Sequence, residues 1–385
     1  MKSFVYENST RVCFGKGVVD SVGEELRQLG LTRVLMVYGK GSIRRNGVYD
    51  RVKASLKKQG IEALEHGGVH GNPRLSHVRE GIGKARAAAV DGLLGVGGGS
   101  VIDATKAIAV GTVSEADIWE YFSGRARVKR TLPVAAVLTL PATGSEMNGI
   151  SVLTNEETFE KNALVAPGVL NPKVSIMDPE TTRSLSTTQT AYACTDILSH
   201  IMEAYFTTSA ERLPLQDNLI EGVARGTVEA MGVIQDDSEN IDARASFMWA
   251  ATLSWSGICQ AGIPNPSMPC HALEMPMSAI YDMAHGAGLS VVIPAWIATV
   301  GERHLPRIQS FAGAVFGTYA ETSPALAEIF RQYYRTIGSP VTFTEAGVSN
   351  PDIDRLTELA SRAFAQRNMT DYTRELISSI YRACL

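Results

Sequence analysis

Aspartate and histidine side chains in the second half of the chain have the spacing of a metal site. Asp196 and His200 are four residues apart in ACTDILSHIMEAY, so on a helix they share one face, about one turn apart. His271 and His285 lie fourteen positions apart in HALEMPMSAIYDMAH. One carboxylate with three imidazoles suits Fe(II) or Zn(II) and leaves room for a substrate oxygen. We predict one divalent metal per chain, held by Asp196, His200, His271 and His285.

This cluster depends on burial and on a reversal of the chain. An isolated Asp–His pair is often only a surface hydrogen bond, but the apolar neighbours of Asp196 predict a buried helix, where a charge needs a partner or a metal. A straight helix would separate His271 from His285 by ~21 Å. Pro276 and the Asp and Gly of YDMAHG are typical of a helix end, so we expect the chain to fold back. Glu203 is a candidate to support the ligands.

A glycine-rich stretch in the first half is typical of phosphate binding. VGGGSVIDATKAIAV (96–110) places Gly97, Gly98 and Gly99 after an apolar run and before a helical pattern. Glycine lets the backbone approach a phosphate, the helix N-terminus attracts it, and Ser100 is a candidate cap or donor. A tight turn without a ligand is the alternative. TLPATGSEMN (139–148) is a second polar strand end, which favours a nucleotide crevice although G-x-G-x-x-G is absent.

The residues that follow VLMVYG (34–39) bear on which nucleotide is bound. NAD-selecting domains carry an acidic residue at such a strand end, to hold the ribose 2′-hydroxyl. Here the chain continues as GKGSIRRNG, and the small or basic residues are Gly39, Lys40, Gly41, Ser42, Arg44 and Arg45. Basic side chains would neutralise a 2′-phosphate, so we expect NADP(H) to be favoured over NAD(H). A solvated charged loop is the alternative.

The elements that position these residues differ between the two halves of the chain. Apolar runs at 34–39, 92–99, 134–142 and 174–179 alternate with amphipathic stretches at 47–60 and 75–90, which predicts an α/β domain with a parallel, Rossmann-like sheet. From about residue 185 onward the patterns are helical, interrupted by the loop SWSGICQAGIPNPSMPC. We predict an α/β nucleotide-binding domain over 1–184 and an all-α metal-binding and catalytic domain over 185–385.

Composition excludes several classes of protein. The 385 residues carry a formal charge of −4 without a basic stripe, which argues against nucleic acid as a partner. The N-terminus lacks an apolar leader and no segment reaches ~18 uninterrupted apolar residues, so we expect no membrane segment. Five scattered cysteines suit reduced thiols in the cytoplasm. The remaining histidines lie in polar contexts, and the first two are predicted in a loop: His66, His70, His77 and His304.

Taken together and in order, these motifs resemble the iron-containing (group III) alcohol dehydrogenase family, within it the butanol dehydrogenase and NADPH-dependent aldehyde reductase branch. The similarity runs from YENSTRVCFGKG through GGGSVIDATKAIA, TLPATGSE and D-x-x-x-H to H-x13-HGAGLSVVIPAW. It implies the two-domain plan shared with dehydroquinate synthase, a small alcohol or aldehyde substrate and a homodimer. It implies the four metal ligands named above, and cofactor contacts at Gly97, Gly98, Gly99, Ser100, Asp103, Thr139, Leu140, Thr143, Ser145 and Lys161.

The resemblance implies hydride transfer between NADP(H) and a primary alcohol/aldehyde pair, with the metal as Lewis acid. The stretches GISVLT, SWSGICQ and MPMSAIY predict an apolar substrate pocket, with lining candidates Asn148, Ile150, Ile258 and Met275. The family usually has a histidine at position 275; methionine cannot relay a proton, so we expect an apolar wall there. Alternatives are a glycerol dehydrogenase-like polyol oxidoreductase, a dehydroquinate synthase-like lyase and a non-catalytic metal protein.

Overall fold

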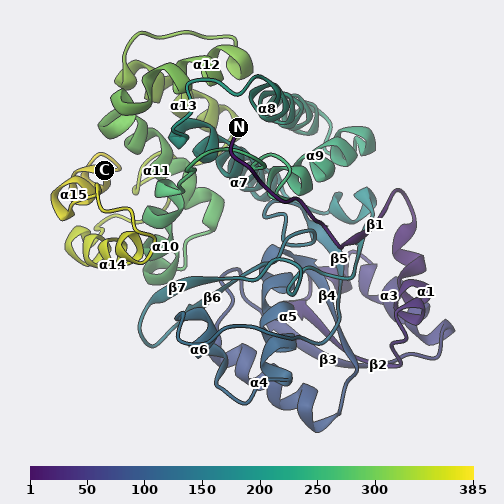
Figure 1. Ribbon diagram of the computed structural model, residues 1–385. Helices are drawn as coiled ribbons and strands as arrows, with labels where there is room; N and C mark the ends of the chain where they lie inside the picture. The colour runs from purple at the N-terminus through teal and green to yellow at the C-terminus, as the bar shows by residue number, and fades with distance from the viewer. The chain divides into compact units, whose positions relative to one another are not determined.

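The computed structural model describes residues 1–385, which form two compact units (Figure 1). One unit comprises Glu7–Leu185, and the other comprises Ser186–Leu385 together with Met1–Tyr6. The sequence-based boundary at 184/185 lies one residue from this division, and it differs in placing residues 1–6 with the α/β unit. The backbone N–H of Lys2 donates to the carbonyl of Gly262 at 2.8 Å, which attaches the segment to the helical unit.

The unit Glu7–Leu185 is built on a six-stranded parallel sheet, as predicted. Its strand order is β1-β8-β5-β4-β2-β3, and every pair is parallel. The strands are β1 (Arg11–Phe14), β2 (Arg33–Gly39), β3 (Glu62–Val69), β4 (Gly92–Gly98), β5 (Val134–Leu140) and β8 (Val174–Met177). The helices are α1 (Val22–Gln28), α2 (Ser42–Arg45), α3 (Val48–Lys58), α4 (Leu75–Ala87), α5 (Gly99–Thr112) and α6 (Ile118–Phe122), with 3-10 turns η1 (Val18–Ser21) and η2 (Pro179–Thr182).

Helices cover both faces of this sheet because its interior strands carry apolar side chains on both faces. In β2, Leu35 and Val37 pack into a core with residues of α4 and α5. Val34 and Met36, which point to the opposite face, pack into a core with residues of α1 and α3. Strands buried on both faces read as continuous apolar runs, which is the pattern that the sequence shows in 34–38.

The order in which the chain adds strands to the sheet changes direction between the neighbouring strands β2 and β4. The chain reaches β3 from β2 through α3, on one face, and reaches β5 from β4 through α5, on the other. Neighbouring strands whose connections diverge leave a crevice at their carboxyl ends, where open α/β sheets bind ligands. The carboxyl ends at this point are Gly39 of β2 and Gly97–Gly98 of β4, since Tyr38 pairs with Val96.

The edge strands β1 and β3 and a hairpin of this unit were not predicted from the sequence. A two-stranded antiparallel hairpin, β6 (Ile150–Asn155) with β7 (Glu160–Val165), follows the polar loop after β5. The edge strand β3 contains His66, which is buried; the prediction of a loop at His66 was wrong. The imidazole Nε2 of His66 bonds the carbonyl of His77 at 3.0 Å, and the two rings stack with centroids 4.0 Å apart.

The second unit is helical throughout, as predicted. It contains α7 (Thr187–Thr207), α8 (Pro214–Asp236), α9 (Ile241–Ser254), α10 (Pro269–Tyr281), α11 (His285–Val300), η3 (Gly301–His304), α12 (Leu305–Phe316), α13 (Ser323–Ile337), α14 (Ile353–Gln366) and α15 (Arg374–Arg382). α7 and α11 are buried along almost their full length, which places any polar side chain on them in the core. None of the helices is both long and apolar enough to cross a bilayer.

Candidate functional site

Asp196 and His200 project from the middle of α7, one turn apart. A capping box starts this helix: the Ser186 hydroxyl accepts from the backbone of Gln189, whose side chain accepts from the backbone of Ser186. From Ala193 to Phe206 every residue is buried, including both ligand candidates. The helix therefore delivers a carboxylate and an imidazole into an apolar interior.

The two later histidines are brought back towards each other by a helix break. His271 lies in the first turn of α10, which begins at Pro269, and the helix ends at Tyr281. Asp282 then adopts the left-handed conformation with φ 50°, and α11 begins at His285. The predicted reversal is confirmed, since the rings of His271 and His285 lie with centroids 5.2 Å apart.

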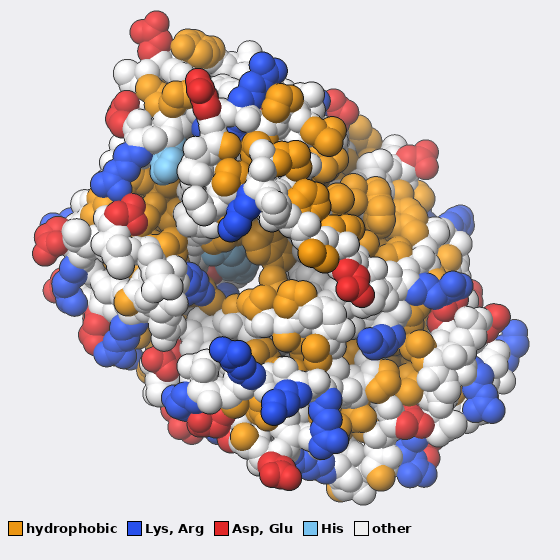
Figure 2. Space-filling model, viewed as in Figure 1, with side chains coloured by type: hydrophobic (Ala, Val, Ile, Leu, Met, Phe, Trp, Pro, Cys, Tyr) orange, Lys and Arg blue, Asp and Glu red, His pale blue; other side chains and the backbone are white.

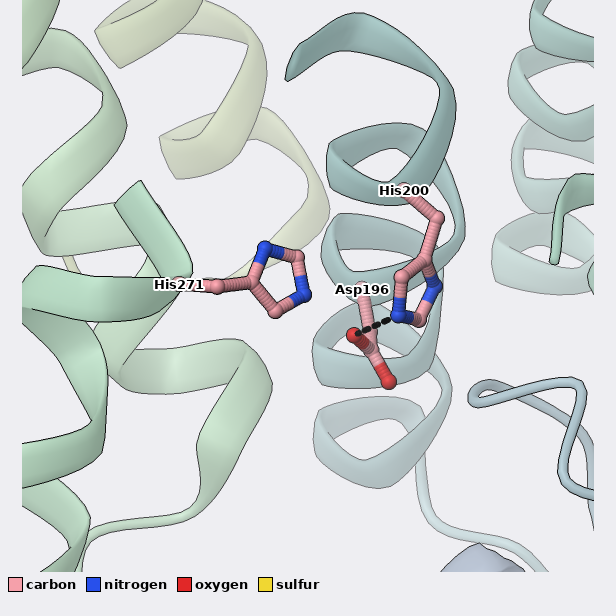
Figure 3. Close-up of side chains that lie close together, drawn as sticks. All are labelled: Asp196, His200 and His271. Atoms are coloured by element: carbon pink, nitrogen blue, oxygen red, sulfur yellow. Dashed lines mark ion pairs between the residues drawn. The ribbon is translucent and has the colours of Figure 1, made fainter. Parts of the chain in front are cut away.

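Three of the predicted ligands form a compact cluster (Figure 3). One ligand atom each from Asp196, His200 and His271 lies within 4.8 Å of the other two. His200 Nε2 is 3.6 Å from Asp196 Oδ1, and His285 Nε2 is 3.7 Å from the same oxygen. His285 thus borders the cluster on the side of Asp196, and its role as a fourth ligand stays a prediction.

Two buried glutamates hold the imidazoles of the later stretch. Glu203, two turns along α7 from Asp196, accepts from Nδ1 of His271 at 2.9 Å and from the backbone N–H groups of Cys270 and His271 at 3.1 Å each. Glu274, which is fully buried, accepts from Nδ1 of His285. A carboxylate on Nδ1 fixes the ring and leaves Nε2 with its lone pair available, which is the usual arrangement behind metal-bound histidines.

The electrostatics of the cluster fit a cation. Asp196 Oδ1, His200 Nδ1 and His271 Nε2 are buried without a hydrogen-bond partner, and such atoms are costly unless a ligand engages them. Burial lowers the pKa of His200 to about 3, so its imidazole stays neutral. Burial also opposes charge on His271, but Glu203 outweighs it and raises that pKa. Neutral imidazole and carboxylate oxygen are suitable donors for Fe(II) or Zn(II).

An aromatic side chain that the sequence reasoning missed lies against this cluster. Trp255 follows α9, and its ring stacks on that of His200 with centroids 4.8 Å apart. Gln260 donates to the backbone carbonyls of His200 at 3.2 Å and of Ser254 at 2.8 Å. The loop after α9 therefore packs directly on the first ligand helix.

The carboxyl edge of the parallel sheet gathers the predicted cofactor residues. Gly98 pairs with Leu140, so the ends of β4 and β5, with Thr139 next to Leu140, lie side by side. A Cβ on Gly99 would come within 2.2 Å of the Thr143 hydroxyl, so only glycine permits this approach of the two loops. No side chain caps α5 and its first turn holds no acid, which leaves its N–H groups free for a phosphate.

Behind this edge a fully buried lysine ties the motifs together. Lys106 of α5 donates to Ser145 Oγ at 2.9 Å and to the carbonyls of Asn148 and Ile150 at 2.9 and 2.7 Å. Asp103 accepts from the Ser145 hydroxyl at 2.6 Å. Burial lowers the pKa of Lys106 to about 8. This network fixes the loop after β5 against α5.

Comparison with known proteins decides the family. The sequence model of the iron-containing alcohol dehydrogenase family matches residues 9–179. The model of the C-terminal part of that family matches residues 190–385. NADH-dependent butanol dehydrogenase A of Clostridium acetobutylicum is 37% identical over 369 residues, 94% of each chain. NADPH-dependent aldehyde reductase YqhD of Escherichia coli is 31% identical over the whole of both chains. The chain belongs to the iron-containing alcohol dehydrogenase family.

The fold of this iron-containing alcohol dehydrogenase agrees closely with a solved relative. The crystal structure of NADH-dependent butanol dehydrogenase A from Thermotoga maritima superposes with a TM-score of 0.95 at 38% identity, covering 100% of this chain and 99% of the other. The chain is thus an NAD(P)-dependent oxidoreductase of the alcohol dehydrogenase type, with a divalent metal site that includes Asp196, His200 and His271. The resemblance stated from the motifs is confirmed.

The dehydrogenase's predicted cofactor residues divide into those at the sheet edge and those inside the network. Gly39, Gly97, Gly98, Gly99, Thr139, Leu140 and Thr143 lie at or beside the edge, and Gly41 and Ser42 begin α2 just after β2. The Lys161 ammonium donates to Asn72 at 3.1 Å, in the loop after β3. Asp103 and Ser145 are occupied within the Lys106 network. The Ser100 hydroxyl donates to the carbonyl of Gly71, and its contact with the cofactor stays a prediction.

Arg44 has contacts within the protein that the sequence analysis did not include. Its guanidinium donates to Glu65 and to the Tyr38 hydroxyl, both at 2.8 Å, and lies 3.9 Å from the ring centroid of Tyr49. Glu65 is on β3, the strand next to β2. The sequence analysis considered only the residues that follow β2 and so did not include this carboxylate. Arg44 is therefore already paired, and Lys40 and Arg45 are the basic side chains that remain at this strand end.

The four predicted pocket residues have different surroundings. The Asn148 side chain is buried and bonds Lys106, the Ile150 backbone and the Thr143 carbonyl. Ile150 begins β6, and the Ile258 carbonyl accepts from Gln216 at 2.9 Å. Met275 is only 7% exposed, on α10. The polar atoms of Asn148 are all engaged, so its part in substrate binding stays a prediction.

Proposed function

We propose that the chain catalyses reversible hydride transfer between NADP(H) and a primary alcohol/aldehyde pair. The observation that carries the proposal is the buried cluster of unpartnered Asp196, His200 and His271 atoms, in a chain of the iron-containing alcohol dehydrogenase family. Relatives named as butanol dehydrogenases and as an aldehyde reductase support this substrate class.

The side chains have distinct parts in this reaction. Asp196, His200, His271 and, as we propose, His285 would hold the metal. Glu203 and Glu274 take the Nδ1–H of His271 and His285, so that each ring presents Nε2. When bound, a divalent ion supplies a Lewis acid for a substrate oxygen, and the nicotinamide accepts or gives the hydride. Trp255 stacks on one face of the His200 imidazole.

The test is a substrate scan with metal-loaded protein, followed by NADPH absorbance at 340 nm. Reduction of butanal that disappears after chelation and returns with Fe(II) or Zn(II) is the expected result. Oxidation of glycerol in preference to butanol would favour the glycerol dehydrogenase-like alternative instead. Tight metal binding without turnover of any alcohol or aldehyde would favour a non-catalytic protein.

Preference for NADP(H) over NAD(H) is a separate part of the proposal. Gly39 offers no carboxylate at the end of β2, and Lys40, Ser42 and Arg45 follow it. A 2′-phosphate with one basic partner gains ~1.5–3 kcal/mol, or ~10- to 150-fold in affinity. Relatives named NADH-dependent, including butanol dehydrogenase A of Clostridium acetobutylicum, make this preference one to measure.

Gly39→Asp tests the preference with little risk to folding. A Cβ on Gly39 would meet its nearest atoms, Val69 O and Val101 Cγ2, at 3.7 and 3.9 Å, which is ordinary contact. We expect the ratio of kcat/KM for NADPH to that for NADH to fall at least ~10-fold, because the carboxylate repels the 2′-phosphate. Equal kcat/KM for the two cofactors in the unmodified enzyme would contradict the proposal.

We also propose a homodimer in the cytoplasm. All five cysteines are free thiols, which suits a reducing compartment. On the visible face, hydrophobic side chains gather over the region of α9 and the N-terminal segment, whereas acidic and basic side chains are interspersed elsewhere (Figure 2). Within that segment Phe4 is 53% exposed and Val5 is 95% exposed. Exposed apolar side chains of this size support contact with a second copy.

A further inference from the structure

Arg367 has a guanidinium whose surroundings do not balance its charge. It follows α14, where Nη1 donates to the Ala363 carbonyl at 3.0 Å and Nη2 contacts the Sδ atom of Met275 at 3.0 Å. A thioether is a weak acceptor, and no carboxylate lies within ion-pair distance of Arg367. Burial lowers its pKa, and Glu203 is the charge that acts in the opposite direction. The side chain is therefore a partly desolvated cation without a counter-ion.

Arg307, a buried arginine of the same unit, has a different environment. It forms a two-pronged ion pair with Asp217 at 2.7 and 2.8 Å and stacks on Tyr205. A buried guanidinium is normally paired in this way, because the uncompensated charge is costly. The contrast indicates that Arg367 keeps its N–H donors for a group that is not part of the chain.

The position of Arg367 relates it to the metal cluster. Its contact, Met275, is four residues after His271 on α10, so the two side chains share a helix face and lie ~6 Å apart along the axis. Glu203, the charge that acts on Arg367, is also the carboxylate that holds His271. The guanidinium is therefore placed about one helical turn from an imidazole of the metal site, within the same unit.

We propose that Arg367 binds an anionic group at the far end of a short aldehyde substrate. The inference rests on the proposed function, since it assumes that the carbonyl oxygen is bound at the cluster of Asp196, His200 and His271. A guanidinium binds carboxylate, sulfonate or phosphate through paired N–H donors. A separation of about one turn fits a chain of about two to four carbons between the carbonyl and the anion. The substrate class is thus the short semialdehyde acid rather than the neutral aliphatic aldehyde.

The test compares two aldehydes of equal length, butanal and 4-oxobutanoate, with the metal-loaded enzyme. We expect kcat/KM for 4-oxobutanoate to be at least ~10-fold higher, and Arg367→Gln to remove that advantage mainly through KM, because a charged hydrogen-bonded pair is lost. Arg367→Lys should keep part of it. Arg362→Gln is the matched control, since Arg362 is exposed on α14 and pairs with Glu358 in the same helix. No preference over butanal for 4-oxobutanoate, nor for the phosphorylated or sulfonated short aldehydes, in the unmodified enzyme would overturn the proposal.

Two further measurements distinguish a failure of the anion site from a failure of the proposed function. Phosphorylated and sulfonated short aldehydes identify the preferred anion, and a preference for any of the three anions over a neutral partner supports the proposal. Calorimetry with succinate, which cannot be reduced, measures anion binding without turnover; we expect Kd to rise at least ~10-fold in Arg367→Gln and to stay unchanged in Arg362→Gln.

An enzyme that reduces no aldehyde yet binds succinate through Arg367 would contradict the proposed function alone. A variant Arg367→Gln that melts at a lower temperature but keeps its preference for 4-oxobutanoate would mean that the guanidinium only joins α14 to α10, and it would overturn the anion site.

Discussion

Each histidine of the metal cluster has a carboxylate or an aromatic ring that fixes it, so removal of one imidazole leaves the others in place. We expect metal-loaded His271→Ala to lose most of its bound metal, because Nε2 is the free donor of that ring. His285→Ala should also lose metal if His285 is the fourth ligand. Elemental analysis of the purified variants measures this, with His77→Ala, in the other unit, as control. Full metal occupancy in His285→Ala would limit the site to three protein ligands.

Met275→His tests whether an imidazole at this position contributes to proton transfer. General acid–base help is worth ~10²-fold or more, so we expect kcat to rise if a proton relay is missing. Because the guanidinium of Arg367 contacts residue 275, it disfavours a protonated imidazole there, and the new ionisation in the pH profile of kcat should lie below about 6.5. Metal content should not change. A folded, metal-loaded variant with an unaltered profile would mean that residue 275 acts only in packing.

At the scale of single residues, the sequence predicted those site features that depend on residues close together in the chain. Asp196 and His200 follow from a four-residue interval, and the break at Asp282 follows from turn chemistry. Glu274 was missed because nothing in its spacing separates a buried carboxylate from a solvated one, although it lies inside the quoted histidine stretch. Arg367 was beyond prediction, since its contact with Met275 joins positions 92 apart in the chain.

Among the elements, the turn between β4 and α5 depends on Gly99, because this residue has no Cβ. In Gly99→Ala the new methyl group would press against Thr143, 2.2 Å away, and would push the loop after β5 out of place. We expect nucleotide affinity to fall at least ~10-fold, as judged by fluorescence titration with NADPH, with a lower melting temperature.

Gly83→Ala is the matched control for that substitution. Its Cβ would meet nothing within 4 Å on α4, so the variant should bind NADPH normally and gain about 0.5–1 kcal/mol of helix stability. The double variant Gly99→Ala with Thr143→Ala should recover part of the loss. Unchanged affinity in Gly99→Ala alone would contradict close packing of the two loops as the reason for glycine.

The strand β3 carries a prediction about acid stability. Burial lowers the pKa of His66 to about 4, below its usual value near 6.5. The unfolded chain therefore takes up a proton before the folded one, so stability that is fully present above pH 6.5 is lost as the pH falls towards 4. In His66→Gln the melting temperature should depend less on pH between 6.5 and 4. Parallel curves for the two proteins would assign the acid sensitivity to other groups.

The strands that were predicted lie in the interior of the sheet, and β3, which was missed, lies at its edge. β2, β4, β5 and β8 are interior strands and read as apolar runs, whereas β3 is an edge strand whose Glu65 and His66 obscure the pattern. Glu65 is tolerated because Tyr38, Tyr49, Arg44 and Lys53 all donate to it. These donors come from β2, α2 and α3, and no single-strand pattern includes them.

For the whole molecule, the exposed N-terminal segment makes the proposed dimer testable. Val5→Asp places a charge where the side chain is 95% exposed, so the fold of one chain should be unaffected. If this surface is the interface, sedimentation velocity should show a shift from dimer to monomer, because a buried unpaired charge is strongly unfavourable. Glu7→Lys, just past the segment, controls for a mere change of charge. Dimers of equal stability in both variants would place the interface elsewhere.

The chain passes between its two units twice, at residues 6 and 7 and again at 185 and 186. During translation the α/β unit is complete at Leu185, before residues 1–6 can attach to the helical unit, because their partner Gly262 lies further along the chain. At ~5–20 residues per second, the stretch from 185 to 262 takes roughly 4–15 seconds to synthesise. Until then the segment that carries Met1, Phe4 and Val5 has no backbone partner in the helical unit, and its apolar side chains, which stay exposed after folding, are open to binding by ribosome-associated chaperones.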